Sequence, residues 1–184
     1  MKVRLPHAPY MANKIAIDML NSGVIKLLKG TEPIAKIALE LLEANIKKEM
    51  ALEERVDEIL DDNDDEIEFR QVDRRSMFWL IKKKLAKEYD VILSFEDRFS
   101  DISHKILETI WQEDLIAYSV SENRVKNVIY TSIEDYLNKF EGIEDSVADQ
   151  IENYKRKLIP GSLEYDLVFE RLYEDELKRR GMSL

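Results

Sequence analysis

The sequence predicts an all-α protein built from a duplicated three-helix unit. The chain of 184 residues contains only 5 Gly and 4 Pro, so it offers few turns and favours long helices. Apolar residues recur at steps of three and four along most of the chain, which is the spacing of one helix face. The two halves of the sequence also resemble each other, and this points to a duplication.

The duplication appears when the chain is aligned with itself at an offset of 91 positions. This alignment needs no gap over most of its length, and it places Lys14 against Lys105, Ile15 against Ile106 and Ile25 against Ile116. A period this long indicates a repeated small domain rather than a solenoid, whose repeats span about 20 to 50 residues. We therefore predict two repeats, residues 1–92 and 93–184.

Each repeat is expected to contain three helices. The predicted ranges are about 9–21, 32–62 and 71–89 in the first repeat, and about 100–113, 122–156 and 162–180 in the second. Thr31 and Pro33 supply a cap residue and a first-turn proline for the long helix of the first repeat. The apolar links at 23–28 and 115–120 are compatible with turns or with two short strands, and the sequence leaves both open.

The long second helix of each repeat determines the predicted architecture. The helix over 32–62 would extend about 46 Å at 1.5 Å per residue, and the first helix covers less than half of that length. An antiparallel hairpin with the third helix would cover the rest. We predict a four-helix antiparallel base from which two helical-hairpin arms project, with arms more mobile than the base. Two compact three-helix domains are the alternative.

Composition limits the classes of function. The formal net charge is −10, which argues against a general polyanion binder, although the first repeat is nearly balanced. The longest apolar runs, "VIKLL" and "MFWLI", are far shorter than the roughly 20 residues of a membrane span. The chain has no cysteine and no apolar signal segment near its start, so we expect a cytoplasmic protein.

The acidic run "ILDDNDDEIEF", residues 59–69, invites comparison with a calcium-binding loop. An EF-hand loop needs Gly at its sixth position and Glu at its twelfth. Counted from Asp61, these positions hold Glu66 and Val72, and counting from Asp62 fails as well. We interpret the run as the solvated tip of an arm. Its counterpart in the second repeat is the basic segment "ENYKRKLIP", so the two predicted tips carry opposite charge.

A basic stripe on the third helix of the first repeat is the main candidate interaction surface. It is interrupted by Phe78 and Trp79, which could form an aromatic platform for nucleic acid. We favour a structural interpretation, in which the stripe faces Glu53, Glu54, Asp57 and Glu58 and the aromatic residues lie in the arm core. With the basic tip of the second repeat, the candidate residues are Arg74, Arg75, Lys82, Lys83, Lys84, Lys155, Arg156 and Lys157.

Motifs for catalysis, cofactors and metals are absent from the sequence. His7 and His104 are the only histidines, and Asp101 with His104 resembles half of a di-iron motif whose other half is missing. The segment "GVIKLLKGT" has Leu where a phosphate-binding loop would have Gly-Lys. We therefore expect no catalytic, cofactor or metal residues, and a protein that is not an enzyme.

The segment "KLIPGSLEYDLVFERLYEDELKRRG", residues 157–181, resembles the end of a bacterial family known as domain of unknown function 507. The opening "RLPHAPYMANKI" and the link "EDLIAY" resemble the same family, so the similarity covers essentially the whole chain as two fused family-like units. The first repeat departs from the pattern, because it has "EFRQVDRRSMFWLIKKKLAKEYD" in place of the Pro-Gly-Ser start. The resemblance implies no activity, since the family has no assigned function.

The function expected from the sequence is a non-enzymatic, helical protein-interaction or scaffold protein with two mobile arms. The alternative is a protein that associates with RNA or DNA through the basic third helix of the first repeat. A protein partner is favoured over nucleic acid, no membrane association is expected, and the oligomeric state is left open.

Overall fold

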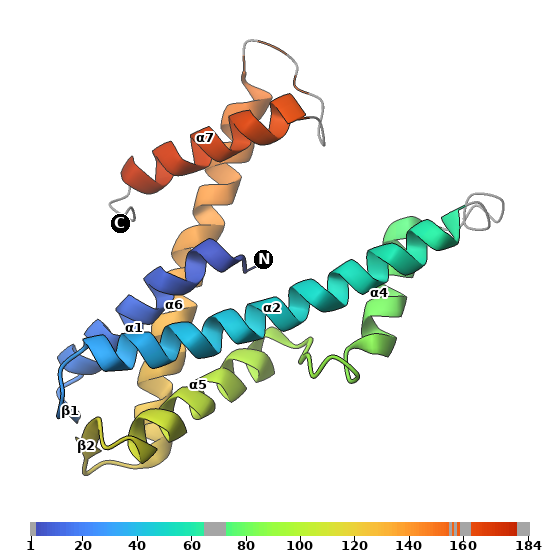
Figure 1. The fold of residues 1–184 in the computed structure, drawn as a ribbon. Coiled ribbons are helices and arrows are strands. Elements are labelled where there is room, and N and C mark those ends of the chain that lie inside the picture. Colours follow the sequence, from blue (N-terminus) through green and yellow to red (C-terminus); the bar gives the residue numbers. More distant parts are fainter. Residues whose placement is uncertain (1–2, 65–72, 155, 157, 159–162, 180–184) are drawn as a thin grey trace. The chain divides into compact units, whose positions relative to one another are not determined.

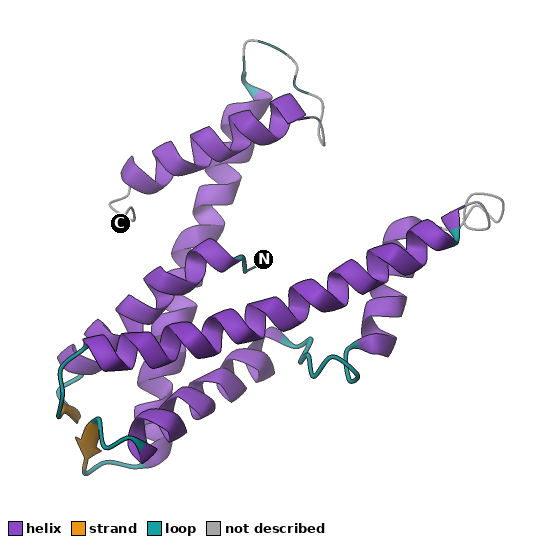
Figure 2. Cartoon of the chain, viewed as in Figure 1, coloured by secondary structure: helices purple, strands orange, loops and turns teal. Residues whose placement is uncertain are grey.

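The computed structural model describes residues 3–64, 73–154, 156, 158 and 163–179. The elements follow one another along the chain, as Figures 1 and 2 show. They are η1 (Leu5–His7), α1 (Ala8–Asn21), β1 (Ile25–Leu27), α2 (Glu32–Asp62), α4 (Arg74–Leu85), α5 (Phe95–Gln112), β2 (Ile116–Tyr118), α6 (Glu122–Glu152) and α7 (Leu163–Arg179). Apart from two short strands, every long element is a helix, so the predicted all-α class is confirmed.

Contacts divide the chain into two compact units, residues 2–130 and 131–184, and the division falls within α6. This division describes contacts in space, whereas the repeats 1–92 and 93–184 describe similarity in sequence. The four-helix base would combine helices from both units, and it stays a prediction.

In the unit of residues 2–130, α1 and α5 both pack against α2. The buried residues of α1, among them Met11, Ile15 and Met19, follow the steps of three and four seen in the sequence. Ile102, Ile106 and Ile110 form the corresponding buried stripe of α5, and Ile34, Ile37 and Leu42 are buried on α2. The apolar periodicity therefore builds this core.

The distal part of α2 packs against α4, which runs in the opposite direction, because Arg74 at its start pairs with Asp64 and Lys82 further along pairs with Glu53. Figure 1 shows α4 beginning beside the far end of α2 and then descending obliquely from it. Leu52, Val56 and Leu60 of α2 join Ala86 in a buried cluster. The half-buried residues packed against this cluster are Met77, Phe78, Ile81, Leu85, Tyr89 and Val91. The hairpin thus has a small apolar core of its own.

The α4 helix is shorter than the range 71–89 predicted for it. It begins after Asp73, whose side chain accepts a hydrogen bond from the Ser76 amide at 2.9 Å, and residues 71 and 72 lie outside the described part. It ends at Leu85, and a turn follows in which Asp90 has a left-handed φ of 52°. The turn was missed because residues 86–89 keep the apolar spacing of a helix.

The α5 helix begins at Phe95, five residues before the predicted start near 100. Ser94 caps it by accepting a hydrogen bond from the Asp97 amide at 3.4 Å, and Glu96 and Asp97 stand in the first turn, where the helix dipole favours acids. The capping signal was present in the sequence, but the prediction relied on the apolar spacing alone.

In the unit of residues 131–184, the distal part of α6 carries a buried stripe of Tyr136, Phe140, Ile143, Val147 and Ile151. The ring of Phe140 lies 6.0 Å from that of Tyr173 on α7, and Tyr173 in turn stacks on Phe169 at 5.9 Å. The helix ends at Glu152, earlier than the predicted 156. The Pro-Gly-Ser segment, residues 160–162, lies outside the described residues.

The apolar links form two short strands that pair with each other. β1 and β2 are antiparallel, with Ile25 opposite Tyr118, Lys26 opposite Ala117 and Leu27 opposite Ile116. Lys26 and Ala117 are 91 positions apart, the offset at which the two halves of the sequence align. The strand pairing is therefore centred on two residues that this alignment matches.

The backbone just before each strand repeats at the same offset. Gly23 follows α1 with a left-handed φ of 70°, and Asp114 follows α5 with a left-handed φ of 53°. Both residues stand two positions after the last residue of their helix. A left-handed residue after a helix is a common way to end it, and here the two ends use equivalent positions.

Candidate functional site

The outward side of α4 and of the turn after it carries apolar and basic side chains together. We call this surface the docking face, and its members are Arg75, Trp79, Leu80, Lys83, Lys84 and Lys87, all of which are exposed. Trp79 keeps 55% of its surface accessible and Leu80 keeps 52%. Steps of four residues from 75 to 87 place most of these side chains on one stripe.

The cations of the docking face are free of ion pairs in the described part of the chain. Arg75, Lys83, Lys84 and Lys87 form none, whereas the neighbouring Arg74 pairs with Asp61 and, at 2.8 Å, with Asp64. Arg74 thus joins the start of α4 to the end of α2. The four free cations form a local positive surface on an otherwise acidic protein.

Trp79 departs from the expectation that the aromatic residues lie in the arm core. Phe78 is half-buried and packs against the hairpin core, while the Trp79 ring meets it edge-on at 6.1 Å and remains mostly exposed. Adjacent residues on a helix point about 100° apart, so only one of the two can face α2. Phe78 is the residue that faces α2.

Lys82 is one of the candidate interaction residues of the basic stripe, but only 3% of its surface is accessible. Its ammonium group lies 2.9 Å from Glu49 Oε1 and 2.8 Å from Glu53 Oε1, both on α2. The predicted pairing of this helix with acids of α2 thus occurs at Glu53. Of the other expected partners, Glu58 pairs instead with Arg55 on its own helix.

Glu49 is shared between two cations from different helices. Its second oxygen accepts a hydrogen bond from Nη1 of Arg98 on α5, and Arg98 Nε donates to Asn45 Oδ1 at 2.6 Å. Arg98 is 7% exposed, and its Nη2 is buried without a hydrogen-bond partner. We call Glu49, Glu53, Lys82 and Arg98 the charge network, and it joins α2, α4 and α5.

The protonation of the charge network is set by its ion pairs. Burial alone would raise the pKa of Glu49, but the charge of Arg98 and hydrogen bonds from Lys82 and Arg98 bring that pKa below its ordinary value. Burial would lower the pKa of Lys82, but hydrogen bonds to Glu53 and Glu49 bring it above its ordinary value. Both shifts favour the charged forms, so the two groups stay charged near neutral pH.

The basic tip predicted in the second repeat is described only at Arg156, because Lys155 and Lys157 lie outside the described residues. Arg156 is exposed and lies 3.8 Å from Glu164. Residues 65–69 of the acidic run are also outside the described part, so the comparison of the two tips stays a prediction.

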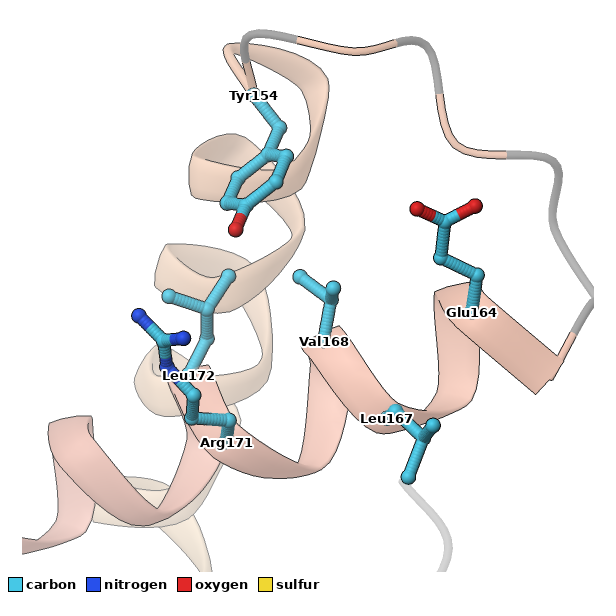
Figure 3. A pocket seen from close by; sticks show the side chains of 6 residues that line it. All are labelled: Tyr154, Glu164, Leu167, Val168, Arg171 and Leu172. Atoms are coloured by element: carbon cyan, nitrogen blue, oxygen red, sulfur yellow. The ribbon is translucent and has the colours of Figure 1, made fainter.

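A groove between the end of α6 and α7 was not foreseen from the sequence. It has a volume of about 410 Å³ and is lined by Tyr154, Glu164, Leu167, Val168, Arg171 and Leu172. Figure 3 shows Val168 and Leu172 directed from α7 toward Tyr154, with Glu164 and Arg171 at different turns of the helix. Steps of three and four residues on α7 could have indicated its apolar floor. Among the described residues that line the groove, no nucleophile stands beside a general base.

Groups suited to metal binding or catalysis do not come together in the parts of the chain described. No cluster of three or more His, Cys, Asp or Glu side chains could hold a metal ion among these residues. His7 is buried and its pKa is lowered to about 4 by burial and by the charge of Arg4, while His104 is exposed on α5. None of the helices searched is long and apolar enough to cross a membrane.

Comparison with known proteins gives a family but no activity. No curated protein matches this chain. A family model described as "Protein of unknown function (DUF507)" matches residues 1–182, which is nearly the whole sequence. The chain therefore belongs to the DUF507 family of proteins of unknown function.

Proposed function

We propose that this is a non-enzymatic, helical interaction protein that binds an acidic segment of a partner protein through the docking face of α4. The observation that carries the proposal is the exposure of Trp79 and Leu80 among four cations that form no ion pair with any described residue. Exposed aromatic and aliphatic residues at the centre of a polar rim are typical of protein interfaces. The cations would select for an acidic partner and guide its approach.

A scaffold role for the two arms and a cytoplasmic location are part of this proposal. The hairpin of α2 and α4 has its own apolar core, which suits an arm that presents a surface. The cysteine-free sequence suits a reducing compartment.

We also propose that the chain arose by duplication of a unit of about 91 residues, as the sequence offset indicates. Support comes from the pairing of each strand with its counterpart and from the left-handed residues Gly23 and Asp114 at equivalent positions. In such a chain the third helices of the two repeats can diverge in sequence. The charges of α4 and α7 differ in this way, since α4 is basic and α7 is rich in acidic residues.

Single-stranded nucleic acid is the second candidate partner, and the exposed indole of Trp79 is the observation that favours it. Bases stack on exposed aromatic side chains between cations. The net charge of −10 opposes the approach of a polyanion, however, and the docking face offers phosphate groups four cations that are unpaired among the described residues. We therefore place a protein partner first.

The two candidates are separated by binding measurements with defined probes. The first probe is a synthetic amphipathic helix of Glu and Leu, and the second is oligo(dT). In a Trp111→Phe background, Trp79 is the only tryptophan and its fluorescence reports binding at the docking face. We expect the peptide to bind, and the double variant K83E/K84E to weaken its binding roughly tenfold or more, about 1.4 kcal/mol per factor of ten.

The matched control is K36E/K139E, because these two lysines are exposed and lie outside the docking face. Its affinity for the peptide should match that of the parent protein. Equal peptide affinity in K83E/K84E and the parent would contradict the proposed site. Tight oligo(dT) binding that falls steeply with salt, without peptide binding, would establish the second candidate instead.

A further inference from the structure

The buried Lys82 lies directly beside the most exposed aromatic residue of the docking face. Its ammonium nitrogen is 5.2 Å from the centre of the Trp79 ring, one helical turn earlier on α4. A cation at this distance from an indole attracts it, and the attraction is stronger where the cation is shielded from water. Lys82 is therefore placed to influence the orientation of Trp79.

We propose that Lys82 is a positioning residue of the docking face, held by Glu49 and Glu53 so that its ammonium fixes the Trp79 indole in an outward orientation ready to bind. This inference rests on the proposed function of the docking face. It adds that residues which never touch the partner determine how well the face binds it.

The geometry around Lys82 explains why it can hold an indole in place. A lysine side chain is normally mobile, and fixing it costs rotamer entropy. Here the carboxylates of Glu49 and Glu53 bind the Lys82 ammonium nitrogen at 2.9 and 2.8 Å, and the side chain is buried. Lys82 is therefore already ordered before a partner binds. A pre-ordered Trp79 would lose less entropy on binding, which strengthens binding without a new contact.

Glu49 extends this arrangement to a third helix. One of its oxygens binds Lys82 of α4 and the other binds Arg98 of α5. Among the described residues, the charge network places two cations against two carboxylates. The orientation of Trp79 is thus linked through Lys82 and Glu49 to the first turns of α5.

The first test needs no partner, so it stands apart from the proposed function. In the Trp111→Phe background, the fluorescence anisotropy decay of Trp79 reports its side-chain motion, and acrylamide quenching reports its exposure. We expect Lys82→Met to speed the side-chain motion of Trp79 and to raise its quenching. Lys82→Arg keeps a cation that can pair with both carboxylates, so it should restore much of the slow motion.

The matched control is Lys47→Met, since Lys47 also forms an ion pair on α2, with Glu43 at 2.9 Å, but is exposed. It should leave the Trp79 signal unchanged. Because Lys82→Met could loosen α4 itself, Glu53→Gln provides a milder variant that keeps the bond to Glu49, and circular dichroism checks that helix content is retained. Unchanged Trp79 motion in folded Lys82→Met and Glu53→Gln would overturn the inference.

The second test uses the Glu-Leu peptide. If Lys82 positions Trp79, folded Lys82→Met should bind the peptide several-fold more weakly, and Lys47→Met should bind it like the parent. Trp79 could move more slowly in the parent than in Lys82→Met while neither protein binds the peptide. This result would uphold the positioning role of Lys82 and reject the proposed partner. Peptide affinity unchanged by Lys82→Met would reject the role of positioning in binding.

Discussion

At the scale of single residues, the identity of a cation says little about where it lies. Lys82 and Lys83 are neighbours in the sequence, but Lys82 is buried between two carboxylates and Lys83 is exposed. Removing one partner of a buried ion pair leaves an uncompensated charge and costs roughly 3 to 5 kcal/mol, whereas exposed pairs contribute about 1 kcal/mol or less. The same residue type therefore has a structural role at one position and a recognition role at the next.

His7 is the residue from which a pH dependence of stability is expected. It is 3% exposed, and its pKa of about 4 in the folded protein lies below the ordinary value of 6.5. The unfolded chain therefore binds a proton more readily, and the free energy of unfolding should fall as the pH drops from about 6.5 toward 4. A shift of this size corresponds to a loss of at most about 3.4 kcal/mol, at 1.36 kcal/mol per pKa unit.

Urea denaturation of the parent and of His7→Gln at pH 7 and pH 5 checks this expectation. The parent should lose more stability between the two pH values than the variant, which cannot titrate at this position. His104→Gln is the matched control, because His104 is exposed, and it should behave like the parent. Equal pH dependence of the parent and His7→Gln would contradict the assigned role of His7.

At the scale of elements, the hairpin of α2 and α4 is expected to open as a unit. Its cluster of Leu52, Val56, Leu60 and Ala86 is covered mainly by α4 and the turn that follows. Leu60→Ala removes a side chain that is 1% exposed, and such truncations cost roughly 2 to 5 kcal/mol. The loss should appear first as faster hydrogen exchange of the α4 amides, while the amides of α1 keep their protection.

Ile15→Ala on α1 is the control for this prediction, because Ile15 is fully buried but lies outside the hairpin cluster. It should weaken protection in α1 and should not selectively expose α4. Simultaneous loss of protection in α1 and α4 in Leu60→Ala would show that the hairpin has no independent stability.

At the scale of the whole molecule, β1 pairs with β2 through residues that the sequence alignment at an offset of 91 matches. Lys26 and Ala117 stand opposite each other, and opposed residues of an antiparallel pair lie within the Cα separation that a disulfide allows. The chain contains no cysteine, so the double variant K26C/A117C introduces a single possible pair. We expect it to form an intramolecular disulfide under mild oxidation.

The control is K26C/Y118C, in which the two side chains point to opposite faces of the ribbon because neighbouring strand residues alternate. It should remain largely reduced, as measured by thiol labelling. Equal cross-linking of both variants would contradict the observed register and, with it, the pairing of each strand with its counterpart.

Much of the fold could be predicted from the sequence, because the capping residues and the apolar spacing of a helix lie within the helix itself. The range Glu32–Asp62 of α2 coincides with the expected 32–62, since the first-turn proline and the apolar steps of three and four agree there. The capping role predicted for Thr31 is wrong, because its backbone is already helical and its side chain makes no capping hydrogen bond within the described residues. The ends of α4, α5 and α6 differ from expectation by several residues, because the apolar spacing continues into a turn or begins after the true cap. The basic stripe of α4 was also visible in the sequence.

The helical class, the range of α2 and the gathering of cations on α4 could all be predicted from local sequence patterns, and the relation between the two halves stays a prediction. Only the tertiary structure decided that Trp79 faces outward, that Lys82 is buried while Lys83 is not, and that Arg98 shares Glu49 with Lys82. The physical reason is that helical periodicity specifies which side chains share a face. Which face meets another helix, and which acid meets a given base, depends on packing between segments that are distant in the sequence.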